Sequence, residues 1–600
     1  MRLARWGRFD EALSGAALAL MVLVPMLEIV LRATTGLGVE NASVLVQHLG
    51  LIMTMFGAVA AERYGHLTSL GSSLGQFGNE RIQALVKSLM QSASSLLAGL
   101  LALASWRFVA TEMAAPQALA YGIPIWWVQA SMPLGFMLLG FRLGSRCSPH
   151  RLIRWPLALL LPAAGWALGA HFDETPFALA PGFVVLSAML LAGAPVFAVL
   201  GGLSLLLFAG DALPLASVSL SHYQITVNAS LPALPLYTLA GLLLTRSGAA
   251  ERLTALFVTM FGGGVRGSVI AVAVLCSTFT AFTGGSGVTI LALGGLLLPL
   301  LMKAGYPERR GIGLVTSASA LGVLLAPSVP LILYAVIARV AITDMFLAGL
   351  VPAVLMVLCL LLLGGFLRHD KSATVATQPD FNGALAAAWA AKWELATPFV
   401  ALGSLLSGLA TPMESAALTA AYALFTQALV HRELDLKALA RTFSDCAQII
   451  GGVMLILGMA LALTNFMIDT GIPDRAVEWV QSVIPNRYVF LTVLCIFLFF
   501  AAALMEIYAA IVVLVPLLLP LAKAYGIDPI HFGIIFLAAM EVGFLCPPAG
   551  MNIYFASAMF KQPIATVARS VLPAMAAIFA GTLLIALLPP LATGLPSLFR

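Results

Sequence analysis

Two apolar stretches of this chain carry the same residues in the same order. The first passes through Leu296–Leu300, Lys303, Gly313, Pro327 and Tyr334, and the second through Leu517–Leu521, Lys523, Gly533, Pro547 and Tyr554. Proline and glycine interrupt helices, and here they recur at matching places inside sequence apolar enough to lie in lipid. Duplicated membrane halves with interrupted helices are typical of secondary transporters, whose binding site lies at the interruptions.

The composition of the chain predicts that lipid surrounds it. Of its 600 residues, 61% are hydrophobic and 10% are charged, whereas a soluble domain has about 25% charged residues. Many segments approach the roughly 20 apolar residues that a helix needs to span the hydrocarbon core, so we predict an all-α polytopic membrane protein with about 15–17 transmembrane segments. The net charge of +5 needs no nucleic-acid partner, because the basic residues lie mostly at the ends of apolar segments.

Two basic clusters predict the orientation in the membrane. Arg2, Arg5 and Arg8 precede the first apolar run. Because no small-residue cleavage site follows that run, we interpret it as a retained helix rather than a signal peptide. A second cluster follows the fourth predicted helix and contains Arg142, Arg146, Arg151 and Arg154. Positive residues accumulate on the cytoplasmic side, so both clusters place the N-terminus in the cytoplasm.

Three domains are predicted along the chain. Residues 1–150 form a four-helix domain, residues 151–176 a connecting helix, and residues 177–600 a larger domain with both copies. Within the larger domain we place repeat 1 at about 231–367, a linker at about 368–450 and repeat 2 at about 451–590, and we favour inverted repeats. The six cysteines have no metal or redox spacing and are expected to be buried thiols.

The segment Phe279–Thr289 is the first candidate site. Inside apolar sequence it places three glycines among the hydroxyl residues Thr283, Ser286 and Thr289. Each glycine in a helix costs about 1 kcal/mol relative to alanine, and unwound backbone persists in a membrane only where protein or a cavity satisfies it. Freed carbonyls and hydroxyls suit Na⁺, and the N–H groups of the restarted helix suit a carboxylate. Close packing through small residues is the simpler alternative.

A second break follows in each copy. Pro327 and Pro330 flank Ser328 and cannot both lie in an unbroken helix. The second copy has the segment Cys546–Asn552, in which a double proline and a glycine open the helix and Asn552 offers an amide donor and acceptor. Matching breaks in both copies predict a two-part site.

Three acidic residues in this apolar sequence need an explanation. An intramembrane acid costs roughly 2.5–3.5 kcal/mol on insertion scales and usually faces a cavity or a partner. Equivalent residues of the two copies, such as Gly313 and Gly533, are 220 residues apart, so Glu506 aligns with Ser286. Glu506 is therefore a candidate for the polar group that takes the place of the hydroxyls in the second copy. For Glu541, a position at the membrane interface is an equal alternative. Glu414 follows Thr411-Pro412, which predicts a helix start with a capping box.

These segments resemble the membrane component of tripartite ATP-independent periplasmic (TRAP) transporters, in the form that fuses the small and large permease subunits. Thr280–Pro299 resembles the family's first hairpin region, and residues 1–150 resemble the small subunit. Ala326–Tyr334 resembles its Pro-Pro-Ser-x-Pro stretch, with Ala326 at the first proline. Thr411–Ala417 resembles its Thr-Pro-x-Glu-Ala-Ala element, and Cys546–Asn552 its Thr-Pro-Pro-x-Gly-x-Asn signature, with Cys546 in place of threonine.

The resemblance implies a transporter of the elevator type and not an enzyme. A mobile domain with two re-entrant helical hairpins would carry substrate past a scaffold in the bacterial inner membrane. The resemblance also implies Na⁺ as coupling ion, no organic cofactor and a periplasmic substrate-binding protein as partner. The implied substrate is an organic acid anion: a C4-dicarboxylate, a keto acid, a sugar acid or a sialic acid.

Twelve residues are the candidates for binding sodium or substrate. They are Thr283, Gly284, Gly285, Ser286, Thr289, Pro327, Ser328, Glu506, Pro547, Pro548, Gly550 and Asn552. Among them, the candidate Na⁺ ligands are Ser286, Thr289, Glu506 and Asn552.

Two alternative functions stay open. The first is an elevator-type carboxylate carrier that works without a binding protein. The second is an intramembrane serine protease, because Gly284–Gly287 matches a Gly-x-Ser-Gly pattern with Ser286 as the nucleophile. Such an enzyme needs a histidine base, and we predict that His369, His431 and His531 all lie in polar connecting sequence, which argues against it.

Overall fold

The computed structural model describes residues 9–64, 67, 80–148, 150–172, 179–262, 264–368, 381–547 and 550–599. Within these ranges the regular elements are helices, and one isolated bridge joins Ala118 to Pro124. Twelve of the described helices are long and apolar enough to span a membrane, and four shorter apolar helices have 10–17 residues. The predicted all-α polytopic class is therefore confirmed.

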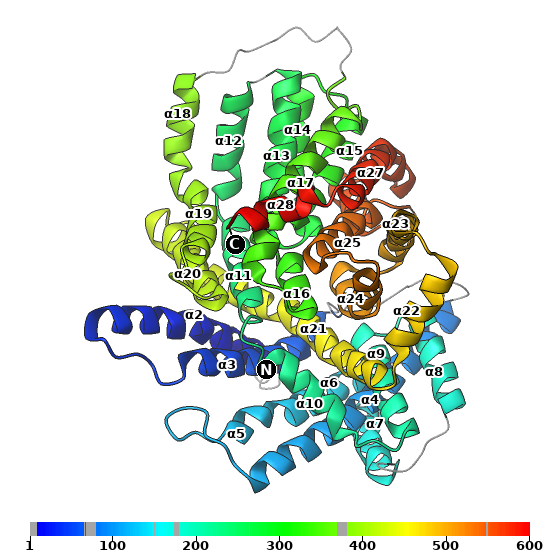
Figure 1. Cartoon of the computed structure of the whole chain (residues 1–600). Coiled ribbons are helices and arrows are strands. Elements are labelled where there is room, and N and C mark those ends of the chain that lie inside the picture. The colour runs from blue at the N-terminus through cyan, green and yellow to red at the C-terminus, as the bar shows by residue number, and fades with distance from the viewer. Residues whose placement is uncertain are drawn as a thin grey trace. The chain divides into compact units, whose positions relative to one another are not determined.

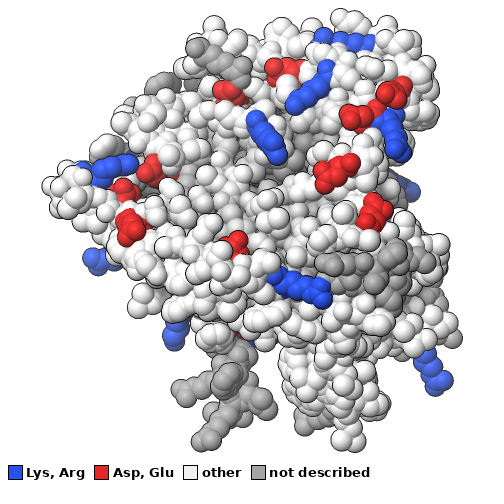
Figure 2. Space-filling model, turned by 60° about the horizontal axis from the view of Figure 1, so that its bottom comes forward, with Lys and Arg blue, Asp and Glu red and all other residues white. Residues whose placement is uncertain are grey.

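The surface of the helices is apolar, as a lipid environment requires. Large side chains such as Leu152, Val184 and Phe399 are 91%, 70% and 76% exposed. Charged residues are sparse and scattered over the face shown in Figure 2. A soluble protein rarely exposes so much contiguous apolar area, so this surface fits a hydrocarbon solvent.

The chain forms two compact units, which we describe separately. The first unit comprises Met1–Pro235 and Ala440–Asp474, and the second unit comprises Leu236–Leu439 and Arg475–Arg600. The helices of the first unit are α2 (Phe9–Thr35), α3 (Ala42–Tyr64), α4 (Glu80–Ala114), α5 (Ile125–Gln129), α6 (Ser131–Gly144), α7 (Arg151–Phe172), α8 (Leu179–Leu191), α9 (Val196–Gly210), α10 (Ala216–Thr226) and most of α21 (Leu436–Asp469) (Figure 1).

Ion pairs tie three helices of the first unit together. Asp10, in the acidic first turn of α2, is paired with Arg63 of α3 at 2.6 Å and with Arg142 of α6 at 3.0 Å. Glu62 of α3 is paired with Arg146, just after α6, at 2.9 Å. The carboxylates of Asp10 and Glu62 are almost fully buried, so each needs a cationic partner.

The second unit contains both apolar copies. Its helices are α11 (Ala233–Thr245), α12 (Ala249–Phe261), α13 (Val265–Thr283), α14 (Ser286–Lys303), α15 (Glu308–Ala318), η2 (Leu321–Leu324), α16 (Val329–Ala338), α17 (Ile342–Leu362), α18 (Phe381–Ala390), α19 (Lys392–Leu406), α20 (Pro412–Leu424), η3 (Phe425–Val430), α22 (Ile472–Val483), α23 (Arg487–Leu504), α24 (Ile507–Ala524), α25 (Pro529–Gly543), α26 (Met551–Phe560), α27 (Ile564–Leu587) and α28 (Pro590–Phe599).

Each copy has the same order of elements. Helices α13 and α14 form a hairpin that is followed by α15, a break and α16. Helices α23 and α24 form the equivalent hairpin, followed by α25, a break and α26. The breaks before α16 and α26 therefore lie at the positions predicted from the proline and glycine residues, Pro327 in the first copy and Pro547 and Gly550 in the second.

The predicted capping box at the start of α20 is confirmed. The Thr411 hydroxyl accepts a hydrogen bond from the Glu414 N–H, and the Glu414 carboxylate accepts one from the Thr411 N–H at 2.8 Å. Pro412 occupies the first helical position, where its missing N–H does no harm.

An ionic cluster connects α12, α19 and the loop after η3. The Arg252 guanidinium contacts Glu394 at 2.7 Å and Glu433 at 2.6 Å. The Glu394 side chain is fully buried and also accepts a hydrogen bond from Gln427 at 3.1 Å. This cluster satisfies Oε1 of Glu394, far along the sequence from Arg252, whereas Oε2 has no hydrogen-bond partner among the described residues.

Candidate functional site

The first hairpin turns in two glycines. Helix α13 ends at Thr283 and α14 begins at Ser286. Gly284 has a φ of +69°, in the left-handed region, and a Cβ there would lie 2.7 Å from Cγ2 of Val329. Glycine is therefore required at this position for two reasons, one conformational and one steric.

The hydroxyls of three threonines, on the two helices that this turn joins, are hydrogen-bonded to one another. Thr280 donates to Thr289 across 2.7 Å, and the Thr283 and Thr289 hydroxyls are 3.1 Å apart. The Thr283 hydroxyl also lies 3.3 Å from the Gly285 carbonyl oxygen. The structure thus joins two predicted residues, Thr283 and Thr289, to Thr280, which was not predicted.

The two copies touch at Ser286 and Asn552. The Ser286 hydroxyl donates to Oδ1 of Asn552 across 2.7 Å, and Nδ2 of Asn552 donates to the Thr316 carbonyl at 3.4 Å. Asn552 is fully buried, and Ser286 nearly so. Asn552 therefore uses both halves of its amide to connect α14, α15 and α26.

The second hairpin turns at Met505 and Glu506. Glu506 caps α24, since its carboxylate accepts a hydrogen bond from the Ala509 N–H at 3.4 Å. Tyr508, the second residue of α24, donates its hydroxyl hydrogen to the Gly284 carbonyl across 2.8 Å. The turns of the two hairpins are therefore in direct contact.

The breaks after α15 and α25 complete the arrangement. Pro327 lies between η2 and α16, and the buried Ser328 hydroxyl, just before α16, has no hydrogen-bond partner among the described residues. In the second copy, Pro547 lies between α25 and α26, and Gly550 immediately precedes α26. Pro548 lies outside the described residues.

Four helix N-termini meet at this place. The first residues of α14 and α26 are joined by the Ser286–Asn552 bond, α24 by Tyr508 to Gly284, and α16 through Val329 beside Gly284. Glu506 caps α24, whereas no side chain among the described residues caps α14, α16 or α26. Unsatisfied N–H groups and aligned peptide dipoles give such ends a positive potential.

Comparison with known proteins identifies the architecture. Residues 183–591, which include both hairpins, match the family described as "Tripartite ATP-independent periplasmic transporter, DctM component". Residues 21–147 match the family described as "Tripartite ATP-independent periplasmic transporters, DctQ component". The chain belongs to the TRAP transporter family. It is a fused permease, with the small and large components in one chain, in the bacterial inner membrane.

Curated TRAP permeases are similar over most of their length. The chain is 31% identical to the C4-dicarboxylate TRAP transporter large permease protein of Pseudomonas aeruginosa, over 66% of this chain and 92% of the relative. It is 31% identical to the protein of the same description from Rhodobacter capsulatus, over 69% and 98%. It is 29% identical to the sialic acid TRAP transporter large permease of Vibrio cholerae, over 62% and 87%.

A buried acid in the second unit has a role that the sequence left open. Glu541 is fully buried in the second unit beside the backbone of Leu324 of η2, and neither of its carboxyl oxygens makes a hydrogen bond of ordinary geometry with the described residues. The signal was an acid inside an apolar helix, but its lack of a partner is visible only in three dimensions. A buried acid without a partner is either neutral or held by a cation.

The expectation that His531 lies in polar connecting sequence is wrong. Asp528 caps α25 and Pro529 begins it, so His531 lies in the first turn of a helix. Its side chain is fully buried, and Nε2 contacts the Ile585 carbonyl at 2.8 Å. His431 does lie in the loop after η3, 3.4 Å from Glu394, and His369 is outside the described residues.

Proposed function

We propose that this TRAP permease takes up an organic acid anion by sodium-coupled elevator transport, with the anion delivered by a periplasmic substrate-binding protein. The observation that carries the proposal is the meeting of four helix N-termini, three of them uncapped by any side chain in the described part of the chain. An anion is stabilised at such ends by N–H donors and by the helix dipole. The names of relatives that act on C4-dicarboxylates and sialic acid support a carboxylate.

Sodium coupling is supported by the oxygen atoms around the first turn. Na⁺ is a hard cation that prefers hydroxyl, carbonyl and carboxylate oxygens. Thr289 is hydrogen-bonded with Thr280 and Thr283, next to the Gly285 carbonyl, and Ser286 and Asn552 form a second hydrogen-bonded pair at the start of the same helix. Glu506 lies at the turn of the other hairpin, so it is a candidate ligand from the second copy.

Transport in reconstituted vesicles tests the proposal. The full chain in proteoliposomes is supplied with radiolabelled succinate or N-acetylneuraminate, together with the cognate binding protein. We expect uptake only when both an inward sodium gradient and the binding protein are present. Uptake that persists without the binding protein would instead indicate an independent elevator-type carrier, and equal uptake in potassium would refute sodium coupling.

A pair of serine variants locates the sodium dependence. Ser286→Ala removes the donor to Asn552 and leaves a buried amide oxygen without a partner, which costs about 1–3 kcal/mol. We expect the sodium concentration for half-maximal uptake to rise by about tenfold or more, as 1.4 kcal/mol corresponds to tenfold. Ser570→Ala is the control, because that buried hydroxyl only donates to Val567 of its own helix. Equal sodium dependence in both variants would remove Ser286 from the site.

A further inference from the structure

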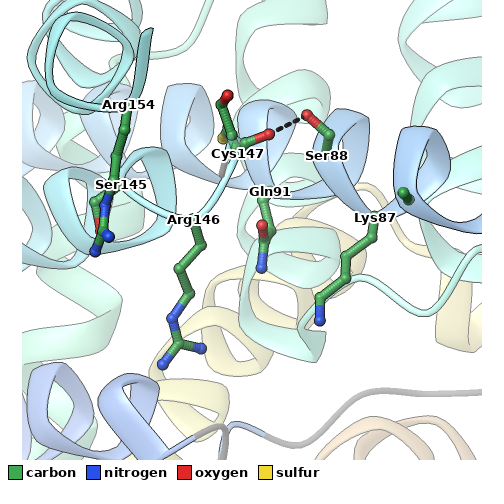
Figure 3. A pocket seen from close by; sticks show the side chains of 9 residues that line it. Lys87, Ser88, Gln91, Ser145, Arg146, Cys147 and Arg154 are labelled. Atoms are coloured by element: carbon green, nitrogen blue, oxygen red, sulfur yellow. Dashed lines mark hydrogen bonds between the residues drawn. The ribbon is translucent and has the colours of Figure 1, made fainter. Parts of the chain in front are cut away.

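A basic pocket lies in the first unit, and none of the residues discussed for transport lines it. Its volume is about 420 Å³. Helix α4, the turn after α6 and the start of α7 line it, with side chains from Lys87, Gln91, Arg146 and Arg154 among others (Figure 3). The Ser88 hydroxyl donates to the Cys147 carbonyl and fixes the turn against α4.

The cationic side chains of this pocket outnumber the acids that face them among the described residues. Arg146 has a carboxylate partner in Glu62, and the nearby Asp10 is already paired with Arg63 and Arg142. Lys87 also interacts electrostatically with Glu62. Arg154 has no acidic partner among the described residues, although it lies over the Trp155 ring at 5.4 Å. Three cationic side chains therefore share one carboxylate, and positive charge remains for a ligand.

Two buried polar atoms in the pocket wall also have no hydrogen-bond partner among the residues that the structure describes. They are Nε of Arg154, a donor, and Oε1 of Gln91, an acceptor. Buried polar atoms are nearly always satisfied by protein, water or ligand. A phosphate oxygen satisfies the arginine donor, and a hydroxyl or ammonium group on the same ligand satisfies the glutamine acceptor.

The surroundings of the pocket are those of a lipid surface. Leu85 and Leu89 on α4 and Leu152 on α7 are 60%, 55% and 91% exposed, on the same turns of helix that carry the pocket residues. The apolar span of α7 begins at Leu152, so Arg154 lies at the end of a membrane helix. Basic pockets between transmembrane helices at this level suit anionic headgroups.

We propose that the pocket formed by Lys87, Gln91, Arg146 and Arg154 binds a phosphate group, carried by an anionic phospholipid headgroup or free in solution. Arg146, held by Glu62, forms one wall, and the charge of Lys87, Arg146 and Arg154 together exceeds that of the one carboxylate. A phosphoglycerol headgroup fits best, because its hydroxyls supply the donor that Gln91 lacks.

Lipid binding to the full chain tests the proposal. Native mass spectrometry measures the ratio of lipid-bound to free protein as phosphatidylglycerol is added to the detergent-solubilised permease. A second arm measures the thermal midpoint in nanodiscs of phosphatidylcholine alone while inorganic phosphate is added. The arms distinguish a lipid headgroup from a soluble anion.

The variants are matched in charge. Lys87→Gln with Arg154→Gln removes two pocket charges, and Lys303→Gln with Arg309→Gln removes two exposed charges of the second unit. We expect the pocket variant to lose phosphatidylglycerol affinity by about fivefold for each charge, from about 1 kcal/mol per basic residue near an anionic surface. The control should keep it, and Lys87→Arg with Arg154→Lys should retain most of it, which shows that the fold is intact.

Each outcome decides the matter. Loss of phosphatidylglycerol binding in the pocket variant alone assigns the site to lipid. Unchanged lipid binding, with a phosphate-induced rise in midpoint that the pocket variant loses, assigns it to free phosphate. If the pocket variant and its control respond alike to both probes, the pocket is not a phosphate site.

Discussion

Glu541 is a buried acid of the permease whose surroundings do not satisfy its carboxyl group. It is fully buried in the second unit, beside the backbone of Leu324, and neither carboxyl oxygen makes a hydrogen bond of ordinary geometry with the described residues. Burying an unpaired charge costs far more than burying a hydrogen-bonded group. A cation arriving at the transport site would offset that cost.

Replacing this carboxyl by an amide separates its charge from its shape. We expect Glu541→Gln to raise the thermal midpoint in sodium-free buffer, since the unpaired acid is removed. We also expect sodium to stabilise this variant less than the native protein, because binding to the folded state stabilises it according to ligand concentration and affinity. Thermal unfolding in choline and in sodium measures both effects. If sodium stabilises both proteins equally, Glu541 has no part in binding it.

The role of a single residue could be predicted from sequence where its partner is a few residues away along the chain, and not where the partner is on a distant element. The role of Glu414 was readable because its partner, Thr411, is three residues away and the spacing itself defines the cap. The contact between Tyr508 and Gly284 was not readable, because it joins the two copies across the fold. The burial of His531 was missed for a related reason: Ile585, its partner, is on another helix.

The hairpin turn at Gly284 is the element on which the site depends. The turn brings the N-terminus of α14 toward Val329 and Asn552, and it holds its carbonyl toward Tyr508. The positions of both hairpin turns could be predicted from sequence, because glycine or an acid inside apolar sequence marks a break. The contacts between the turns depend on tertiary packing, which the sequence pattern does not contain.

A pair of glycine variants measures how crowded this turn is. Gly284 and Gly526 both have a φ of +69°, but a Cβ at Gly526 meets nothing within 4 Å. Gly526→Ala should cost only the left-handed conformation, about 1–2 kcal/mol. Gly284→Ala should cost more and abolish most uptake, because Val329 or the turn must move. Uptake and thermal stability check this, and equal effects at the two glycines would contradict it.

The ionic cluster of Arg252, Glu394 and Glu433 connects α12, α19 and the loop after η3. Burial alone would raise the pKa of Glu433, but the hydrogen bonds from Arg252 and from the Gly248 N–H outweigh it and hold that pKa below its ordinary value. Glu433 therefore stabilises the fold above its ordinary pKa, and this contribution is lost as the pH falls through its lowered value.

Arg252→Gln should destabilise the permease strongly, by about 3–5 kcal/mol, because it leaves the buried Glu394 without its cation. The difference from the native protein should shrink in acid, where Glu433 becomes protonated in both. Thermal unfolding at neutral and acidic pH measures this. Arg309→Gln is the control, since that side chain is exposed. A loss no larger than in the control would show that Glu394 does not need Arg252.

At the scale of the whole molecule, the permease combines a symmetric plan with unequal chemistry. Both copies have a hairpin, a helix and a break in the same order. The first copy supplies hydroxyls at its turn, whereas the second supplies a carboxylate at Glu506 and an amide at Asn552. Sequence comparison showed both the plan and the inequality, but the structure was needed to show that the unlike groups meet.

Because the turns are in contact, sodium should act on both together. We expect sodium to slow amide hydrogen exchange in peptides covering residues 283–289 and 505–509 by similar factors. Tyr508→Phe removes the hydrogen bond to Gly284. In this variant, sodium should still slow exchange in residues 283–289 but should slow it less in residues 505–509. Exchange followed by mass spectrometry measures this. Protection confined to one turn in the native protein would show that the copies respond independently.

The burial of all six cysteines has a practical consequence for studying motion in this permease. Cys147, Cys276, Cys359, Cys446, Cys495 and Cys546 are free thiols inside the protein. A maleimide fluorophore or nitroxide reacts only with a thiol that it can reach. Because Cys147 also lines the basic pocket, it is the one thiol to replace first. A single cysteine introduced at an exposed position would then take the probe against a background of five buried thiols, without rebuilding the core around all six.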